Sequence, residues 1–233
     1  MTGLLRMLAI AATPWITGRA CGSSLPSATP IRGARTVSLS HCHGFHVTSA
    51  LRASTRPPRA ARVAVAATGI ERHWSDDEII VSKTDLAGRI TYANDVFHRV
   101  SGYSPAELLG APHSIIRHPD MPRAIFALLW AQLEAEREVF AYVKNLTPTG
   151  DHYWVFAHIT PTRGPGGRIS GYHSNRRTVD RRALVPIEAL YAELRAAEAG
   201  HARKRDAIAA STALLDRRLA ERGMSYDEYV WRV

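Results

Sequence analysis

Residues 139–177 read VFAYVKNLTPTGDHYWVFAHITPTRGPGGRISGYHSNRR, and this stretch decides the fold class. It contains three runs rich in β-branched and aromatic residues, at 139–146, 151–160 and 169–177. The segments between them, TPTG (147–150) and GPGG (164–167), are turn sequences in which glycine supplies backbone angles that other residues avoid. The stretch therefore predicts three consecutive strands joined by two short turns.

Two shorter strands precede this stretch. Residues 79–81 (IIV) and 89–93 (RITYA) flank the turn sequence Asp85-Leu86-Ala87-Gly88, which predicts a hairpin. Helix signals follow at Asn94 (an N-cap candidate), at Ser104-Pro105-Ala106-Glu107 (a capping-box pattern) and at 123–135 (a broad apolar face). The order β-β-α-α-α-β-β-β predicts an α+β fold, in which a five-stranded antiparallel sheet carries its helices on one face and a ligand pocket lies between the layers.

The N-terminal region differs from the rest of the chain. Residues 1–70 hold eight Arg and no Asp, Glu or Lys, so the formal charge of +9 falls to +1 for residues 71–233. This distribution argues against a nucleic-acid interface on the folded part. Both cysteines, Cys21 and Cys42, also lie in this region, which leaves no thiolate metal site or Cys nucleophile after it.

We interpret residues 1–71 as a disordered basic tail, translated from a start codon upstream of a true start near Glu71. The alternatives are an organellar transit peptide, which has this Arg-rich and acid-free composition, and a signal peptide with its apolar region at 4–16. The spacing of His41, Cys42, His43 and His46 would suit a metal, but no framework that could hold these ligands is apparent.

Several motifs of the central region together resemble a known family. They are DLAGRI (85–90), YAN (92–94), GY (102–103), KN (144–145) and GDHYW (150–154), and their order and spacing resemble those of PAS sensory domains. Residues 110–122, which include RHPDMP at 117–122, closely resemble the PAS domain of bacterial aerotaxis receptors, which hold FAD. The resemblance implies a PAS fold for residues 78–179, FAD as the cofactor, and a stand-alone PAS protein.

The resemblance also implies that the RHPDMP loop is needed to retain FAD. Its charged side chains are Arg117, His118 and Asp120. A guanidinium can donate two parallel hydrogen bonds to phosphate or carbonyl oxygens, while His can donate or change charge and Asp can orient either group. The alternative is a salt bridge within the loop that only closes the pocket.

Four further side chains are candidate flavin contacts. Asn145 can present its amide to the flavin N5 as a donor or, after rotation, as an acceptor; alternatively it is a strand Asn satisfied by the backbone. Asn94 matches a family position near the cofactor but is also the predicted helix cap, and Trp130 is a core residue that can also contact the ring. Phe140 stands where aerotaxis receptors have a Trp, and we expect it to pack on the flavin with less area.

Haem is the other cofactor considered, because His98 and His113 lie on or near the helical layer, although no motif marks either as an axial ligand. No metal site is expected. The sequence has no phosphate-binding glycine loop, nucleophile elbow, zincin His pair or kinase signature, so we do not expect an enzyme.

A C-terminal helical extension is predicted for residues 180–233. Two amphipathic helices end near Gly200 and Arg222, and a third short one follows a capping box at Ser225. Their narrow apolar stripes must pack against each other, against the sheet or against another chain. The extension is either a cap on the exposed sheet face or the element that transmits a signal.

The resemblance therefore implies a bacterial, cytoplasmic sensor of redox state or oxygen that holds FAD in a PAS domain. We expect a homodimer that acts on an unknown downstream protein by contact, without binding nucleic acid and without inserting into a membrane. The alternative is a cofactor-free PAS module for dimerisation or adaptor binding, and a bound yellow pigment would distinguish the two.

Overall fold

The computed structural model describes residues 65–233, so the interpretations placed on residues 1–64 lie outside it. The folded region begins before residue 71, because Thr68 N donates to Gly150 O at 2.9 Å and Arg72 N donates to His152 O at 2.7 Å. The described fold thus includes residues 68–70, which precede the expected boundary at residue 71. Backbone pairing of this kind requires no side-chain periodicity, so the sequence pattern does not reveal it.

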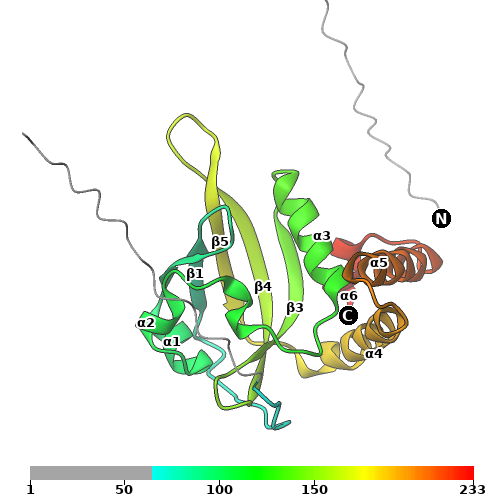
Figure 1. Cartoon of the computed structure of the whole chain (residues 1–233), viewed down its shortest axis with the longest axis horizontal. Coiled ribbons are helices and arrows are strands. Elements are labelled where there is room, and N and C mark those ends of the chain that lie inside the picture. The colour runs from blue at the N-terminus through cyan, green and yellow to red at the C-terminus, as the bar shows by residue number, and fades with distance from the viewer. Residues whose placement is uncertain (1–64) are drawn as a thin grey trace, which may run out of the picture. The chain divides into compact units, whose positions relative to one another are not determined.

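Five antiparallel strands form one sheet, which confirms the predicted fold class (Figure 1). The strands are β1 (Ile80–Thr84), β2 (Ile90–Ala93), β3 (Val139–Leu146), β4 (His152–Arg163) and β5 (Ile169–Arg177). Their order in the sheet is β2-β1-β5-β4-β3. The early hairpin and the three later strands thus join where β1 pairs with β5, and β5 is central.

Four helices in the connection between β2 and β3 cover one face of this sheet. They are α1 (Asp95–Ser101), α2 (Pro105–Leu108), the 3₁₀ helix η1 (His113–Ile116) and α3 (Arg123–Glu134). The predicted caps are present: Asn94 Oδ1 accepts from Phe97 N at 3.1 Å, and the Glu107 carboxylate accepts from Ser104 N at 2.9 Å. The sequence pattern does not predict η1, which is a single helical turn inside an expected loop.

Alternation along the strands gives the sheet two different faces. On β3, Val139 packs with the core under the helices, and Val143 and Asn145 point the same way. Phe140 and Tyr142 point to the opposite face, where they pack with the C-terminal helices. We call the face under α1–α3 the inner face and the other the outer face.

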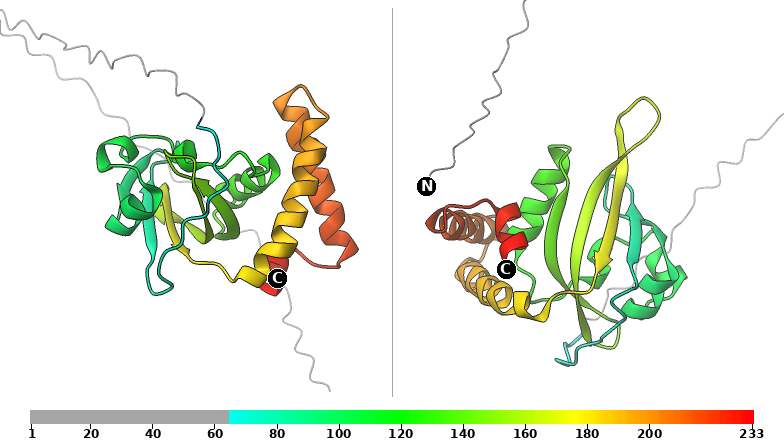
Figure 2. Two further views of the ribbon diagram at one scale, coloured as in Figure 1. Left: turned by 90° about the horizontal axis from the view of Figure 1, so that it is seen from below. Right: turned by 180° about the vertical axis from the view of Figure 1, so that it is seen from behind.

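The C-terminal helices pack together beside the sheet and against α3 (Figure 2). They are α4 (Arg181–Ala199), α5 (Lys204–Glu221) and α6 (Tyr226–Arg232). The core that they share with β3, β4 and α3 is formed by Met121, Ile125, Tyr142, Trp154, Ile187, Tyr191, Leu194, Leu215 and Val230, among others. One buried hydrogen bond, from Tyr191 Oη to Tyr142 O at 2.7 Å, fixes α4 to β3.

Of the three alternatives for the apolar stripes of these helices, the structure shows packing against each other and against the sheet. The helices and the sheet fall in one compact unit rather than in separate domains. Within residues 65–233, no helix combines the length and the apolar character that crossing a bilayer requires.

Candidate functional site

A cavity lies between the inner face of the sheet and the helical layer. Its volume is about 280 Å³, close to the lower end of the range of about 300–1,000 Å³ typical of small-molecule sites. Its apolar wall comes from η1, α3 and the strands, and includes Ile116, Phe126, Leu129, Trp130, Leu133, Val143, Ala157, Ile159 and Tyr172. A wall of this composition suits a flat, largely apolar ligand.

Three buried polar side chains reach the cavity from the floor of the sheet. Asn145 lies on β3, and Ser174 and Arg176 lie on β5. Among the residues described, Asn145 Nδ2, Ser174 Oγ and Arg176 Nη1 have no hydrogen-bond partner. Leaving a buried polar atom unpaired costs about 1–3 kcal/mol, so three such atoms around one cavity indicate a site for a ligand that supplies the missing partners.

The predicted role of Asn145 is therefore compatible with the structure, because the residue faces the cavity with its amide nitrogen unpaired. Its backbone also pairs with that of Arg117, which brings the RHPDMP loop against β3. The alternative, that the backbone satisfies the Asn145 side chain, is not supported.

Sequence reasoning missed Arg176. Its Nη2 contacts Ser82 Oγ at 2.7 Å and His113 Nε2, and its guanidinium lies 5.0 Å from the centre of the Phe97 ring. Burial lowers the pKa of Arg176 to about 10. Tyr172, Ser174 and Arg176 occupy alternate positions on β5 and point to the inner face. An arginine at an inward-facing position of a central strand is the sequence signal that could have identified this residue.

Of the three charged residues predicted in the RHPDMP loop, one faces the cavity and two do not. Arg117 lines the cavity; its Nη2 donates to Met121 O at 2.9 Å, and its guanidinium lies 4.1 Å from the centre of the Phe126 ring. His118 is buried outside the cavity lining, where Nδ1 accepts from Asp120 N at 3.0 Å. Burial and the charge of a neighbouring lysine lower the pKa of His118 to about 4.

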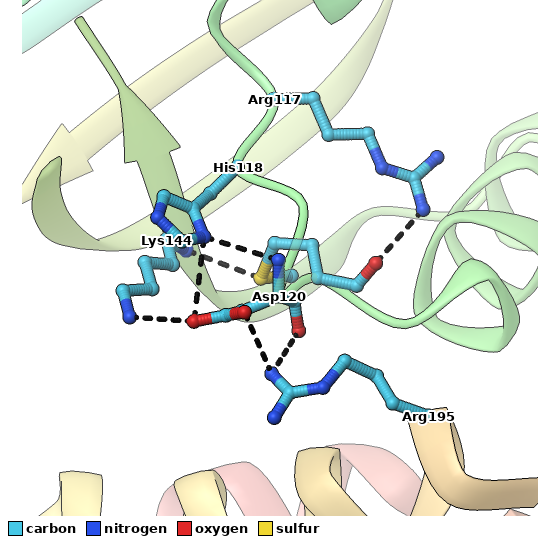
Figure 3. Close-up of polar contacts among 6 residues, drawn as sticks. Arg117, His118, Asp120, Lys144 and Arg195 are labelled. Atoms are coloured by element: carbon cyan, nitrogen blue, oxygen red, sulfur yellow. Dashed lines mark hydrogen bonds and ion pairs between the residues drawn. The ribbon is translucent and has the colours of Figure 1, made fainter. Parts of the chain in front are cut away.

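Asp120 joins the loop to two other parts of the fold (Figure 3). Its carboxylate accepts from Lys144 Nζ of β3 at 2.9 Å and lies 3.4 Å from Arg195 Nη1 of α4. Burial alone would raise the pKa of Asp120, but the hydrogen bond and charge of Lys144, with the charges of His118 and Arg195, hold it below its ordinary value. Neither His118 nor Asp120 lines the inner cavity, and both take part in contacts that hold the loop in place. Their predicted contact with a cofactor stays a prediction.

Two of the remaining candidates also lie away from the cavity. Both ends of the Asn94 amide are occupied. Oδ1 caps α1 by accepting from Phe97 N and also accepts from Val81 N, while Nδ2 donates to Ile79 O at 2.8 Å. Phe140 points to the outer face, where its ring stacks on that of His158 with centroids 4.2 Å apart. Neither residue lines the inner cavity, and their predicted contacts with a cofactor stay predictions.

Trp130 does line the cavity. Its ring meets that of Tyr172 edge-on, with centroids 5.4 Å apart, and the side chain is 37% exposed. An indole that is neither fully buried nor free in solvent is available to contact a ligand at the rim.

The haem alternative finds no support in the geometry. His113 lines the cavity, but its Nε2 is engaged by Arg176 and lies 3.3 Å from Ser82 Oγ, while His98 does not line the cavity. Across residues 65–233, no three His, Cys, Asp or Glu side chains gather in a way that could hold a metal ion.

Comparison with known proteins assigns this fold. A family model described as "PAS fold" matches residues 90–175. The chain therefore contains a PAS domain, the class that its sheet order and single helical layer define.

More narrowly, the domain is similar to that of an aerotaxis receptor of Escherichia coli (strain K12). The two are 45% identical over 122 residues, which is 52% of this chain and 24% of the receptor. A nitrogen fixation regulatory protein of Klebsiella pneumoniae is 32% identical over 101 residues, covering 43% of this chain and 20% of that protein. A blue-light-activated histidine kinase of Rhizobium johnstonii is 29% identical over 143 residues, 60% of this chain and 40% of the kinase.

The chain thus matches less than half the length of each of these relatives. Among solved structures, the PAS domain of a protein from Colwellia psychrerythraea aligns with a TM-score of 0.41 and 21% identity, over 43% of this chain and 86% of that chain. A likeness this distant adds nothing about ligands. The relatives place the domain with PAS domains of signal-transduction proteins.

Proposed function

We propose that this protein is a sensor whose PAS domain holds FAD non-covalently in the inner cavity and responds to redox state or oxygen. The single observation that supports a ligand is the set of three unpaired polar atoms, on Asn145, Ser174 and Arg176, around an otherwise apolar cavity. The name of the aerotaxis receptor supports an oxygen-related signal, and that of the blue-light-activated kinase supports a light-absorbing cofactor.

The residues of the cavity fit a flavin ring. The apolar wall suits its faces, and the floor offers donors for the carbonyl and nitrogen atoms at its edge. A bound flavin supplies an acceptor of electrons whose ring nitrogen gains a proton on reduction. Asn145 can donate from Nδ2 or, after rotation of its amide, accept at Oδ1, so its preferred orientation would differ between the two redox states.

Three contacts offer a route from the cavity to α4. Arg117 faces the cavity and holds the loop through Met121 O. Asp120, three residues later, pairs with Arg195 of α4, and the Glu198 carboxylate of α4 accepts from Arg123 N at 2.5 Å. Glu198 thereby caps the first turn of α3, whose own N-cap residue is a proline without a capping side chain. We infer that a ligand-dependent shift of the loop would alter α4, and that contact of the C-terminal helices with another protein carries the output rather than catalysis.

The first experiment is the visible absorbance spectrum of the freshly purified protein, followed by acid release and identification of the pigment. Flavin bands that bleach on reduction, with FAD as the released compound, are the expected result. A colourless, folded protein that also fails to bind added FAD would contradict the proposal and favour the cofactor-free adaptor.

We predict that Asn145→Leu weakens flavin binding roughly tenfold, because one hydrogen bond of about 1–1.5 kcal/mol is lost without removal of the cavity wall. The measurement is a fluorescence titration of the ligand-free protein with FAD. Asn175→Leu is the matched control, since Asn175 lies on the outer face. Equal affinity of both variants would remove Asn145 from the site.

We predict that Asp120→Ala loosens α4, because it removes the carboxylate that Lys144 and Arg195 share. Hydrogen exchange of the amides of residues 181–199 should become severalfold faster than in the unmodified protein. Asp206→Ala is the control, because the one ion pair of Asp206 within residues 65–233 is with its neighbour Arg205, at 3.9 Å. Unchanged exchange in Asp120→Ala would show that the loop does not hold α4.

A further inference from the structure

The inner cavity contains a buried positive charge that has no negative partner. Arg176 is 3% exposed and lines the cavity from the central strand β5. No aspartate or glutamate lines the cavity, and no carboxylate in residues 65–233 contributes to the electrostatic environment of Arg176. Burial of an unpaired cation is strongly unfavourable, because the charge loses its hydration without gaining an ion pair.

The groups that do contact Arg176 are neutral. Ser82 offers a hydroxyl and Phe97 a ring face. Burial, followed by the charge of Arg176 itself, holds the pKa of His113 well below its ordinary value, so this imidazole is uncharged at neutral pH and accepts at Nε2. The hydroxyl of Tyr153 does not supply a negative charge either, because burial raises the pKa of this group well above its ordinary value.

One end of the guanidinium remains without a partner. Nη2 makes both polar contacts, whereas Nη1 is buried and has no hydrogen-bond acceptor among the residues that the structure describes. A planar guanidinium satisfies two acceptors at once when it meets a carboxylate or a phosphate. The open position therefore calls for an acceptor from outside the chain.

We propose that the ligand of the inner cavity carries a negative charge that pairs with the Arg176 guanidinium. This inference rests on the proposed function and deepens it, because it specifies the charge of the ligand. Arg117 is a second cation in the cavity wall, so the wall holds two guanidinium groups and no acid. In a flavin nucleotide, negative charge is available from the phosphates and from the reduced ring, which is a weak acid.

The first test requires no ligand. Arg176→Met removes the unpaired charge while keeping an unbranched apolar side chain, so the ligand-free variant should melt at a higher temperature than the unmodified protein. Arg177→Met is the matched control: Arg177 is the next residue on β5, is exposed and faces outward, and its replacement should leave the melting temperature nearly unchanged. A melting temperature of Arg176→Met below that of the unmodified protein would overturn the proposal, because it would mean that Ser82, His113 and Phe97 already satisfy the guanidinium.

The second test identifies the source of the negative charge. Ligand-free protein is titrated with riboflavin, which has no phosphate, and with FMN, each oxidised and reduced. If Arg176 pairs with a phosphate, FMN should bind roughly ten- to a hundredfold more tightly than riboflavin, and Arg176→Met should abolish this difference. If Arg176 pairs with the ring, Arg176→Met should bind riboflavin and FMN with equally reduced affinity. The loss of affinity should be largest for the reduced forms.

Retention of full affinity for all four forms by Arg176→Met would overturn the proposal. Arg176→Lys keeps the positive charge but loses the two parallel N–H donors of the guanidinium. It should therefore bind the ligand more tightly than Arg176→Met but less tightly than the unmodified protein. Failure of the unmodified protein to bind any flavin would refute the proposed function instead, and the melting comparison would still decide whether Arg176 lacks a partner.

Discussion

Ile187→Ala should lower the free energy of unfolding of the whole described region by about 2–5 kcal/mol, the usual cost of removing a large side chain from a close-packed core. Ile187 lies on α4, is fully buried, and belongs to the core that joins the C-terminal helices to β3, β4 and α3. The loss should be felt by the sheet because α4 and the sheet share this core. A change of this size is a large part of the stability of a typical domain.

The measurement is a guanidinium chloride titration followed by circular dichroism and by tryptophan fluorescence. Trp154 is a suitable probe, because this buried side chain of β4 packs in the same core as Ile187. Both signals should change in one cooperative transition with a lowered midpoint. Two separate transitions, with only the helical one shifted, would show that the extension unfolds independently of the PAS domain.

Val185→Ala is the matched control. Val185 lies two residues earlier in the same helix and is 72% exposed, so its truncation should change the free energy of unfolding by no more than about 0.5 kcal/mol. The comparison separates loss of core packing from any effect of alanine on helix α4. Equal effects of the two substitutions would contradict the packing that the structure describes.

The fold was largely predictable because its signals are local. The Gly turns, the Asn94 cap and the capping box at Ser104 act within a few residues, and each is present in the structure. The order of the predicted strands and helices indicates the α+β class, because helices confined to one connection must cover one face of the sheet. Residues 68–72 escaped prediction because their partners, the backbone and side chains of residues 149–152, lie more than 75 residues away and no local pattern reports such contacts.

Strand alternation is the sequence signal that sorts the strand residues of the candidate site. Asn145 faces the inner cavity, whereas Phe140 lies an odd number of residues away on the same strand and so faces the other side of the sheet. The same alternation on β5 would have selected Arg176. It was overlooked because a charged residue in a strand is usually exposed.

The directions in which the side chains of the RHPDMP loop point could not be predicted from the sequence. The orientations of His118 and Asp120 depend on Arg195, 75 residues later, and on Lys144 of the outer face. No short-range pattern reports such contacts, and a motif identifies residues without stating which way each points. Of the three charged residues of the loop, Arg117 lines the cavity, while Asp120 pairs with Lys144 and His118 is buried outside the lining.

The domain should lose stability as the pH falls from about 6.5 toward 4, and His118 should account for much of the loss. Burial and the charge of Lys144 lower the pKa of His118 to about 4 in the folded state, against an ordinary value of 6.5. Between these two pH values the unfolded chain binds a proton more readily than the folded chain, so the free energy of unfolding rises with pH. Above this window the stabilisation from neutral His118 reaches its full value. His113 and His152, whose pKa values are also lowered chiefly by burial, act in the same direction.

The test compares the free energy of unfolding at pH 7.5 and pH 5.0. A pKa of about 4 against 6.5 corresponds to a loss of about 2 kcal/mol at pH 5.0 from His118 alone. His118→Asn is the informative variant, because its amide oxygen can accept from Asp120 N as Nδ1 does and does not titrate. The variant should lose about 2 kcal/mol less than the unmodified protein over the same interval, whereas equal losses would mean that His118 is not the group whose protonation opposes folding. Asp120 affects this comparison little, because its carboxylate stays largely ionised in both the folded and the unfolded chain at pH 5.0 and above. The interval from 7.5 to 5.0 therefore reports on the histidines rather than on the ion pairs that hold α4.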